Sequence, residues 1–151
     1  MPQSLAHLAL HVVFSTKDRK AWIEPSSFRE ELHAFLGGVL RGHQCPPLAV
    51  GGTGDHVHFL CLLSRTMTVA DLVRVVKRAV TVWARQHGPE HAGFQWQNGY
   101  GAFSVSASNE DHVRAYIVRQ EAHHEKMDYK AELRELLARH GVAYDEQYVW
   151  D

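Results

Sequence analysis

The chain has 151 residues, of which 45% are hydrophobic and 22% charged, and its formal net charge is −1 at pH 7. These values are ordinary for a globular protein with a buried core, and we expect one domain over residues 1–151. A net charge near zero argues against nucleic-acid binding through a wholly basic surface, although it allows a local basic groove. Two cysteines, Cys45 and Cys61, are too few for a disulfide framework or a zinc ribbon.

The N-terminal segment and the hydropathy of the chain indicate the cellular compartment in which we expect the protein. The first residues lack the basic segment and apolar run of a signal peptide. No apolar run approaches the length of a membrane span, and the few cysteines suit a reducing compartment. We therefore expect a cytoplasmic protein.

The first third of the chain predicts a strand and a helix. Residues 7–15 alternate as in a β-strand, with Leu8, Leu10, Val12 and Phe14 on one face and His7, Ala9, His11 and Val13 on the other. A charged turn follows, which contains Lys17, Arg19 and Lys20. Ser26 or Ser27 then caps a helix that ends at Gly42, with Phe28, Leu32, Phe35, Leu36 and Val39 as its apolar stripe.

A short strand over residues 46–50 and a glycine-rich turn over 51–54 lead into a buried strand that carries two histidines. His56 and His58 share one face of that strand, and Val57, Phe59, Cys61 and Leu63 form the other. The two imidazoles start roughly 7 Å apart at Cα, so both can bind one metal ion and leave its other positions open. The alternative is a pair of partly exposed histidines on a sheet surface.

The second half of the chain predicts three helices and one strand. Thr68 and Asp71 form a capping pair for a helix through Gln86, and the strand covers residues 100–106. Further helices are expected over 110–124 and 129–140, and the tail after Gly141 should pack onto the domain. A basic stripe on the first of these helices is either a solvated face or a phosphate-binding face; it comprises Arg74, Lys77, Arg78 and Arg85.

The element order β-α-β-β-α-β, followed by two helices, predicts an α+β fold of the ferredoxin-like or RRM-like type with an antiparallel sheet. In that topology the first and third strands are neighbours, which brings His11 near His56 and His58. The first two helices do not cover this histidine face. We expect the third helix or a partner subunit to cover it.

Tyr116 and Gln120 stand one turn apart on the helix expected over 110–124. Alone, such a pair can simply be two polar side chains on a solvent-exposed helix face. Together with the two-histidine strand, it supplies an amide oxygen as a possible third metal ligand and a phenol as a possible nucleophile.

Four separated motifs, in this order, resemble those of the HUH single-tyrosine transposases of small insertion sequences, which include the REP-associated tyrosine transposases. The first is His56-Val57-His58, similar to the family's histidine–hydrophobe–histidine motif. The others are the block over residues 94–106, the helix from Tyr116 to His124, and the C-terminal segment over 144–148. The resemblance covers about residues 5–150.

The resemblance implies that Tyr116 is the nucleophile, that His56 and His58 bind a divalent metal, Mg²⁺ or Mn²⁺, and that Gln120 is a third ligand. It implies cleavage and rejoining of single-stranded DNA through a 5′-phosphotyrosine, recognition of hairpins, and a homodimer in which subunits can share active sites. Candidate phosphate contacts are Lys17, Arg19, Lys20, Arg74, Lys77 and Arg78. Trp96 is expected either to stack on a base or to anchor a loop in the core.

Two other functions remain open at this stage. A domesticated hairpin-binding protein keeps the fold and the basic residues but does not need Tyr116. A phosphoesterase that activates water needs the metal but forms no covalent adduct, and the sequence shows no carboxylate cluster to support it.

Overall fold

The structure is a computed structural model and describes residues 2–151. Its centre is a four-stranded antiparallel sheet in the order β2-β3-β1-β4. The strands are β1 (Ala9–Ser15), β2 (Pro47–Gly52), β3 (His56–Leu62) and β4 (Gly101–Val105). This order confirms the α+β, ferredoxin-like arrangement, with β1 and β3 as central neighbours.

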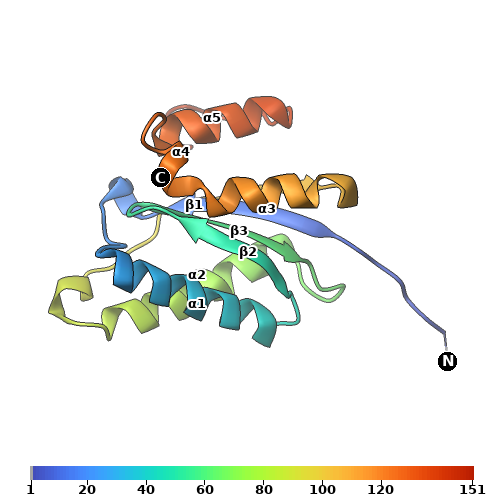
Figure 1. The fold of residues 1–151 in the computed structure, drawn as a ribbon, viewed down its shortest axis with the longest axis horizontal. Helices are drawn as coiled ribbons and strands as arrows, with labels where there is room; N and C mark the ends of the chain where they lie inside the picture. Colours follow the sequence, from blue (N-terminus) through green and yellow to red (C-terminus); the bar gives the residue numbers. More distant parts are fainter. Residues whose placement is uncertain (1) are drawn as a thin grey trace.

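One face of the sheet is covered by α1 (Ser26–Gly42) and α2 (Val69–Arg85) (Figure 1). The main hydrophobic core lies between these layers and contains the expected apolar faces of the two central strands and both helices. Thr68 caps α2, because its side chain accepts a hydrogen bond from the Asp71 N–H at 3.1 Å. Short 3₁₀ turns are η1 (Lys17–Arg19), η2 (Pro89–His91) and η3 (Ala107–Asn109).

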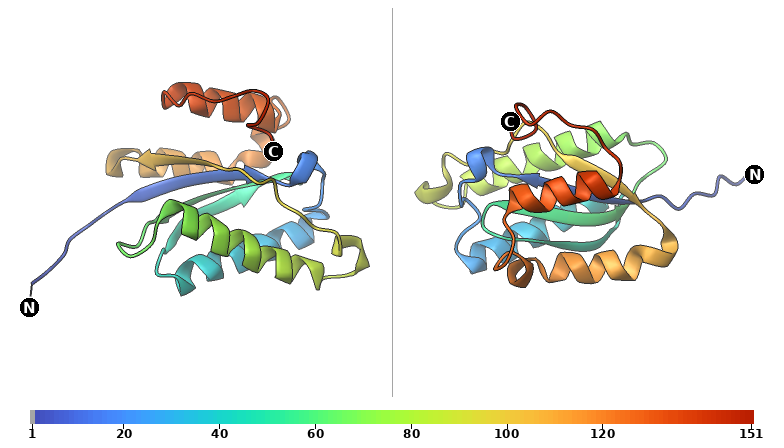
Figure 2. Two further views of the ribbon diagram at one scale, coloured as in Figure 1. Left: turned by 180° about the vertical axis from the view of Figure 1, so that it is seen from behind. Right: turned by 90° about the horizontal axis from the view of Figure 1, so that it is seen from above.

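The opposite face of the sheet is covered by helices of the same chain. These are α3 (Glu110–Val118), α4 (Gln120–His123) and α5 (Tyr129–Arg139), seen above the sheet in Figure 1 and across it in Figure 2. Ile117 of α3 packs on Leu60 and Ala9, while α5 packs on Val13 and Phe103. The expected cover of the histidine face is therefore provided by α3 together with α4 and α5.

Gly51 is a point of close approach between β2 and α3. A Cβ atom at this position would lie 2.3 Å from the Ile117 carbonyl oxygen, which is too close for any side chain. The next residue, Gly52, has φ +148°, a conformation that favours glycine. The predicted turn over 51–54 is shorter than expected, because Gly51 and Gly52 end strand β2 and pair with His58 and Val57.

The structure corrects three further local predictions. The helix expected over 110–124 is interrupted at Arg119, whose N–H is shared between the carbonyls of Ala115 and Tyr116 at 3.2 and 3.3 Å. No serine side chain caps α1, because Pro25 occupies the N-cap position and Ser26 is already helical. The first strand begins at Ala9, so Leu8 lies outside it and is largely exposed instead of contributing to the apolar face.

The C-terminal tail packs against the domain, as expected. Val149 and Trp150 contact the apolar cluster under α5, and the Asp151 carbonyl accepts a hydrogen bond from the Gly99 N–H at 2.9 Å. Trp96 is a buried anchor, with its ring edge-on to Phe14 at a centroid distance of 4.8 Å. None of the helices within residues 2–151 has both the length and the apolar character needed to cross a membrane.

Candidate metal centre and nucleophile

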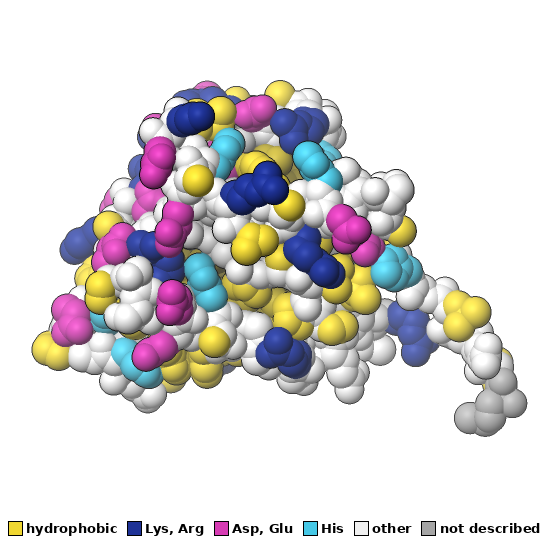
Figure 3. Space-filling model, viewed as in Figure 1, with side chains coloured by type: hydrophobic (Ala, Val, Ile, Leu, Met, Phe, Trp, Pro, Cys, Tyr) yellow, Lys and Arg dark blue, Asp and Glu magenta, His cyan; other side chains and the backbone are white. Residues whose placement is uncertain are grey.

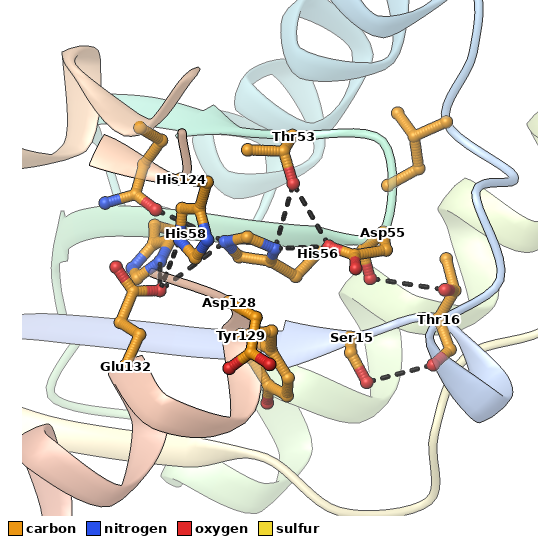
Figure 4. Close-up of polar contacts among 12 residues, drawn as sticks. Ser15, Thr16, Thr53, Asp55, His56, His58, His124, Asp128, Tyr129 and Glu132 are labelled. Atoms are coloured by element: carbon orange, nitrogen blue, oxygen red, sulfur yellow. Dashed lines mark hydrogen bonds and ion pairs between the residues drawn. The ribbon is translucent and has the colours of Figure 1, made fainter. Parts of the chain in front are cut away.

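His56 and His58 project from β3 toward the layer of α3, α4 and α5, and both are fully buried (Figure 4). They share a strand face because side chains alternate along a strand. Their ring centroids are 5.2 Å apart. The sequence therefore placed this pair correctly, but the pair is buried within the protein and not exposed on the sheet surface.

Neighbouring side chains orient both histidine rings. His56 Nδ1 donates a hydrogen bond to Asp55 Oδ1 at 2.7 Å, and the Thr53 hydroxyl donates to the same oxygen at 3.1 Å (Figure 4). His58 Nδ1 and His11 Nε2 are hydrogen bonded at 2.8 Å, which confirms the predicted proximity of His11. Since the Nδ1 atoms are engaged from behind, both Nε2 atoms face the same interior point, an arrangement typical of metal-binding histidines.

Glu132 of α5 lies at that interior point and is buried. Its Oε1 atom is 2.8 Å from His58 Nε2, 3.0 Å from His124 Nε2 and 3.5 Å from His56 Nε2. A buried carboxylate is costly unless it is paired or coordinates a metal, so these imidazoles are essential partners. The carboxylate connects α5, which lies late in the chain, to the β3 histidines.

The electrostatics of the cluster follow from burial and from this carboxylate. Burial would lower the pKa of His56, but hydrogen bonds to Asp55 and Glu132 outweigh it and raise the pKa to about 9. Burial lowers the pKa of His58 to about 4 despite Glu132, and burial and His58 together lower that of His11 to about 3. Burial opposes ionisation of Glu132, yet its histidine partners hold the pKa of this carboxyl far below its usual range.

Tyr116 of α3 reaches the edge of the same cluster. Its ring centroid is 5.8 Å from that of His58, and its hydroxyl donates a hydrogen bond to Glu132 Oε2. Burial and the negative charge of Glu132 raise the pKa of Tyr116 above its ordinary value, so the resting phenol is protonated. Gln120 is also buried, and its Oε1 lies 3.2 Å from His56 Nε2. Although the helix is interrupted at Arg119, Tyr116 and Gln120 both contact the centre.

Four residues could hold a metal ion: His56, His58, His124 and Glu132 each offer one ligand atom, and all four atoms lie within 4.8 Å of one another. Imidazole nitrogen with a carboxylate oxygen is a donor set that suits Mn²⁺ and similar transition metals, whereas Mg²⁺ prefers oxygen ligands. The residues therefore fit a divalent metal.

Most of the predicted phosphate contacts lie elsewhere, beside α2 on the other face of the sheet. Lys17, Arg74, Lys77 and Arg78 line one groove of about 700 Å³ between α2 and the 95–100 segment. Arg74 and Arg78 are exposed along it. Figure 3 shows both basic and acidic side chains on one face of the molecule, in keeping with the near-zero net charge.

Three of the basic candidates make side-chain contacts within the chain: Lys77, Lys20 and Arg74, whose guanidinium lies 3.3 Å from Asp71 Oδ1 on the same helix. The Lys77 ammonium donates to the carbonyls of residues 97, 98 and 99 at 2.8, 3.1 and 2.7 Å, and burial lowers its pKa to about 8. Lys77 therefore holds the 97–99 segment against α2. The Lys20 ammonium lies 4.2 Å from the centre of the Trp22 ring, and Arg19 adopts a left-handed backbone conformation with φ 55°.

Sequence reasoning missed Glu132 and assigned no separate role to His124. A signal for Glu132 was present, because the buried positions of α5 recur at helical spacing and Glu132 falls within them; they are Tyr129, Glu132, Leu133, Leu136 and Leu137. A carboxylate inside an apolar stripe needs a buried partner. Nothing local identifies that partner, which lies 74 residues away at His58.

The sheet, its two helical layers and the buried histidine centre can be compared with known protein families. The family model described as "Transposase IS200 like" matches residues 4–120. The chain belongs to the IS200-like transposase family. Membership supports a DNA-cleaving and DNA-transferring enzyme. No curated protein sequence matches the chain significantly.

Two solved structures share the fold. A candidate transposase from Deinococcus radiodurans R1 is 20% identical, with a TM-score of 0.61 over 78% of this chain and 95% of that one. A REP-associated tyrosine transposase bound to a REP hairpin is 14% identical, with a TM-score of 0.54 over 78% of this chain and 70% of that one. At these identities the likeness concerns the fold.

Proposed function

We propose that this chain is a metal-dependent single-stranded DNA transposase in which Tyr116 cleaves and rejoins DNA through a 5′-phosphotyrosine intermediate. One observation carries the proposal: the Tyr116 hydroxyl stands at the edge of a buried two-histidine centre and shares Glu132 with it. Family membership supports the same reaction class.

The chemistry assigns a role to each side chain. Attack by Tyr116 Oη on the scissile phosphorus forms a P–O bond to tyrosine and breaks the bond to the 3′ oxygen, which departs and gains a proton. Glu132 Oε2 accepts the hydrogen bond of the phenol and so stands where its proton leaves. A divalent metal, Mg²⁺ or Mn²⁺, held by His56, His58 and Gln120 would stabilise the charge that develops on the phosphate and the leaving oxygen.

The product retains the energy of the broken bond. The tyrosyl phosphodiester replaces one phosphodiester with another, so a 3′-OH can attack it and rejoin the DNA without ATP. Both half-reactions need the same groups, because rejoining is the reverse of cleavage with a different 3′ end. The buried centre also limits access of water, which would otherwise hydrolyse the phosphotyrosine.

The DNA would contact basic residues away from the centre. Arg74, Arg78 and Lys17 are the strongest candidates because they line the groove beside α2. Arg19 and Lys20 lie on or beside η1, at the end of β1, and Lys77 shapes the groove through its three carbonyl contacts. Hairpin recognition by this chain is proposed by analogy with the hairpin-bound structure. We propose a homodimer on the resemblance alone.

The test is a denaturing gel of the protein with Mn²⁺ and labelled, hairpin-bearing single-stranded DNA from the flanks of its own gene. We expect a label that remains on the protein, requires metal and disappears in Tyr116→Phe. Tyr148→Phe is the matched control, because Tyr148 is an exposed tyrosine that is not among the residues of the centre. An adduct that persists in Tyr116→Phe contradicts the assignment of the nucleophile.

The other outcomes identify the alternative functions. Tight DNA binding without any adduct, over a panel of substrates, would indicate a hairpin-binding protein without cleavage activity. Metal-dependent cleavage that survives Tyr116→Phe without an adduct would indicate a phosphoesterase that activates water. Either result would overturn the proposed transposase mechanism.

A further inference from the structure

We propose that the C-terminal part of the chain completes the metal centre, with Glu132 and His124 as ligands in addition to His56 and His58. This proposal rests on the metal requirement of the proposed function. Both residues lie beyond the part of the chain that the family model matches, which ends at residue 120. The proposal gives this segment a chemical role as well as a packing role.

The position of Glu132 is the first line of support. Its Oε1 atom lies between the Nε2 atoms of His58 and His124, at 2.8 and 3.0 Å. Its Oε2 atom points away toward the Tyr116 hydroxyl. One carboxylate can therefore bind a metal through Oε1 while Oε2 remains in contact with the nucleophile.

His124 provides the second line of support. Its Nε2 atom is buried and, among residues 2–151, has no partner in hydrogen-bonding geometry, although Glu132 Oε1 is close. Its ring lies against His56 at a centroid distance of 4.3 Å, so both imidazoles border the same point. Coordination through Nε2 would satisfy a polar atom that hydrogen bonding leaves unsatisfied.

Glu132 is held firmly enough to act as a ligand. Asp128 caps α5 by accepting the Ala131 N–H at 2.8 Å, which fixes the start of the helix. At the first position of the helix, Tyr129 is buried and donates its hydroxyl to Gln97 Oε1 at 2.7 Å, and one turn later Leu133 packs into the cluster on Val13. Because Glu132 lies between two anchored residues, its carboxylate is directed into the centre.

This ligand set has a consequence for the metal and for Gln120. Three imidazole nitrogens and one carboxylate oxygen favour Mn²⁺ or a similar transition metal over Mg²⁺, which demands oxygen ligands. A carboxylate is also a stronger ligand for a cation than the neutral amide of Gln120. We therefore expect Glu132 to contribute more to metal affinity than Gln120 does.

The test measures Mn²⁺ binding to the metal-free protein by calorimetry, without DNA. Glu132→Gln keeps the size of the side chain, and we expect it to weaken Mn²⁺ binding by about tenfold or more, by comparison with the losses that even supporting residues of metal sites cause. The matched control is Glu135→Gln, one turn along α5 on its exposed side, which should bind Mn²⁺ as the wild type does. Gln120→Ala should lose less affinity than Glu132→Gln.

A second measurement keeps the proposal testable if Glu132→Gln fails to fold. Pulsed electron paramagnetic resonance of Mn²⁺ bound to the wild-type protein should detect three coordinated imidazole nitrogens, and His124→Asn should remove one. Two nitrogens in the wild type, or unchanged Mn²⁺ affinity in a folded Glu132→Gln protein, would overturn the proposal. Because neither readout involves DNA, both remain decisive if the phosphotyrosine adduct is never observed.

Discussion

Replacing Gly51 with alanine should both destabilise the protein and slow the reaction of Tyr116. The added Cβ would lie 2.3 Å from the Ile117 carbonyl oxygen, where ordinary contacts begin at 3.4 Å, so β2 and α3 must separate by about 1 Å. Overpacking of this kind costs about 1–3 kcal/mol. For a chain of this size each kcal/mol lowers the melting temperature by roughly 2–4 °C.

The same displacement moves the helix that carries Tyr116. A misplacement of about 1 Å can cost on the order of a hundredfold in rate, so we expect slower formation of the DNA adduct as well as a lower melting temperature. Calorimetry and a timed adduct assay measure the two effects. Gly38→Ala is the matched control: Gly38 lies in α1 with no heavy atom within 4 Å of its added Cβ, so alanine should stabilise by about 0.5–1 kcal/mol. A Gly51→Ala protein that melts at or above the wild-type temperature would refute the packing of α3 on β2.

Four further predictions concern the centre and the basic groove. Asp55→Asn should weaken Mn²⁺ binding by about 10–100-fold, because Asp55 orients His56; equal affinity in a titration would show that the hydrogen bond is dispensable. The folded chain should lose stability between pH 6.5 and 5, because His11 has a pKa of about 3 when folded and 6.5 when unfolded, so the unfolded state binds more protons in that range. One such group changes the free energy of unfolding by at most about 1.4 kcal/mol per pH unit. In urea unfolding, His11→Gln should therefore show a weaker dependence of stability on pH than the wild type, and an unchanged dependence would mean that His11 is not buried as a neutral imidazole. Mixing Tyr116→Phe with His56→Ala protein should restore no cleavage, since Tyr116 reaches the histidines of its own chain; recovery would demonstrate sites shared between subunits. Arg74→Gln should lower the salt dependence of DNA binding by about one unit of log K per log salt, and an unchanged slope would remove Arg74 from the interface.

The sequence by itself determined the order of the main strands and helices and the strand that carries the histidine pair. Alternation along residues 7–15 identified one central strand, and the apolar run after the glycine-rich turn identified the other. Helical spacing identified the apolar stripes of α1 and α2. These signals are readable because the faces of a strand or helix repeat over a few residues, and burial selects one face. The element order then placed His11 beside His58, as the structure confirms.

Only the tertiary structure decided what surrounds those histidines. Glu132 comes from α5 and meets His58 across 74 residues of sequence, a pairing that no local period encodes. The same holds for Trp96, which is buried against Phe14, and for Lys77, whose ammonium donates hydrogen bonds to three backbone carbonyls. In each case a polar or aromatic side chain has several possible partners along the sequence, and the partner is selected only when the whole chain packs and a buried charge or donor must be satisfied.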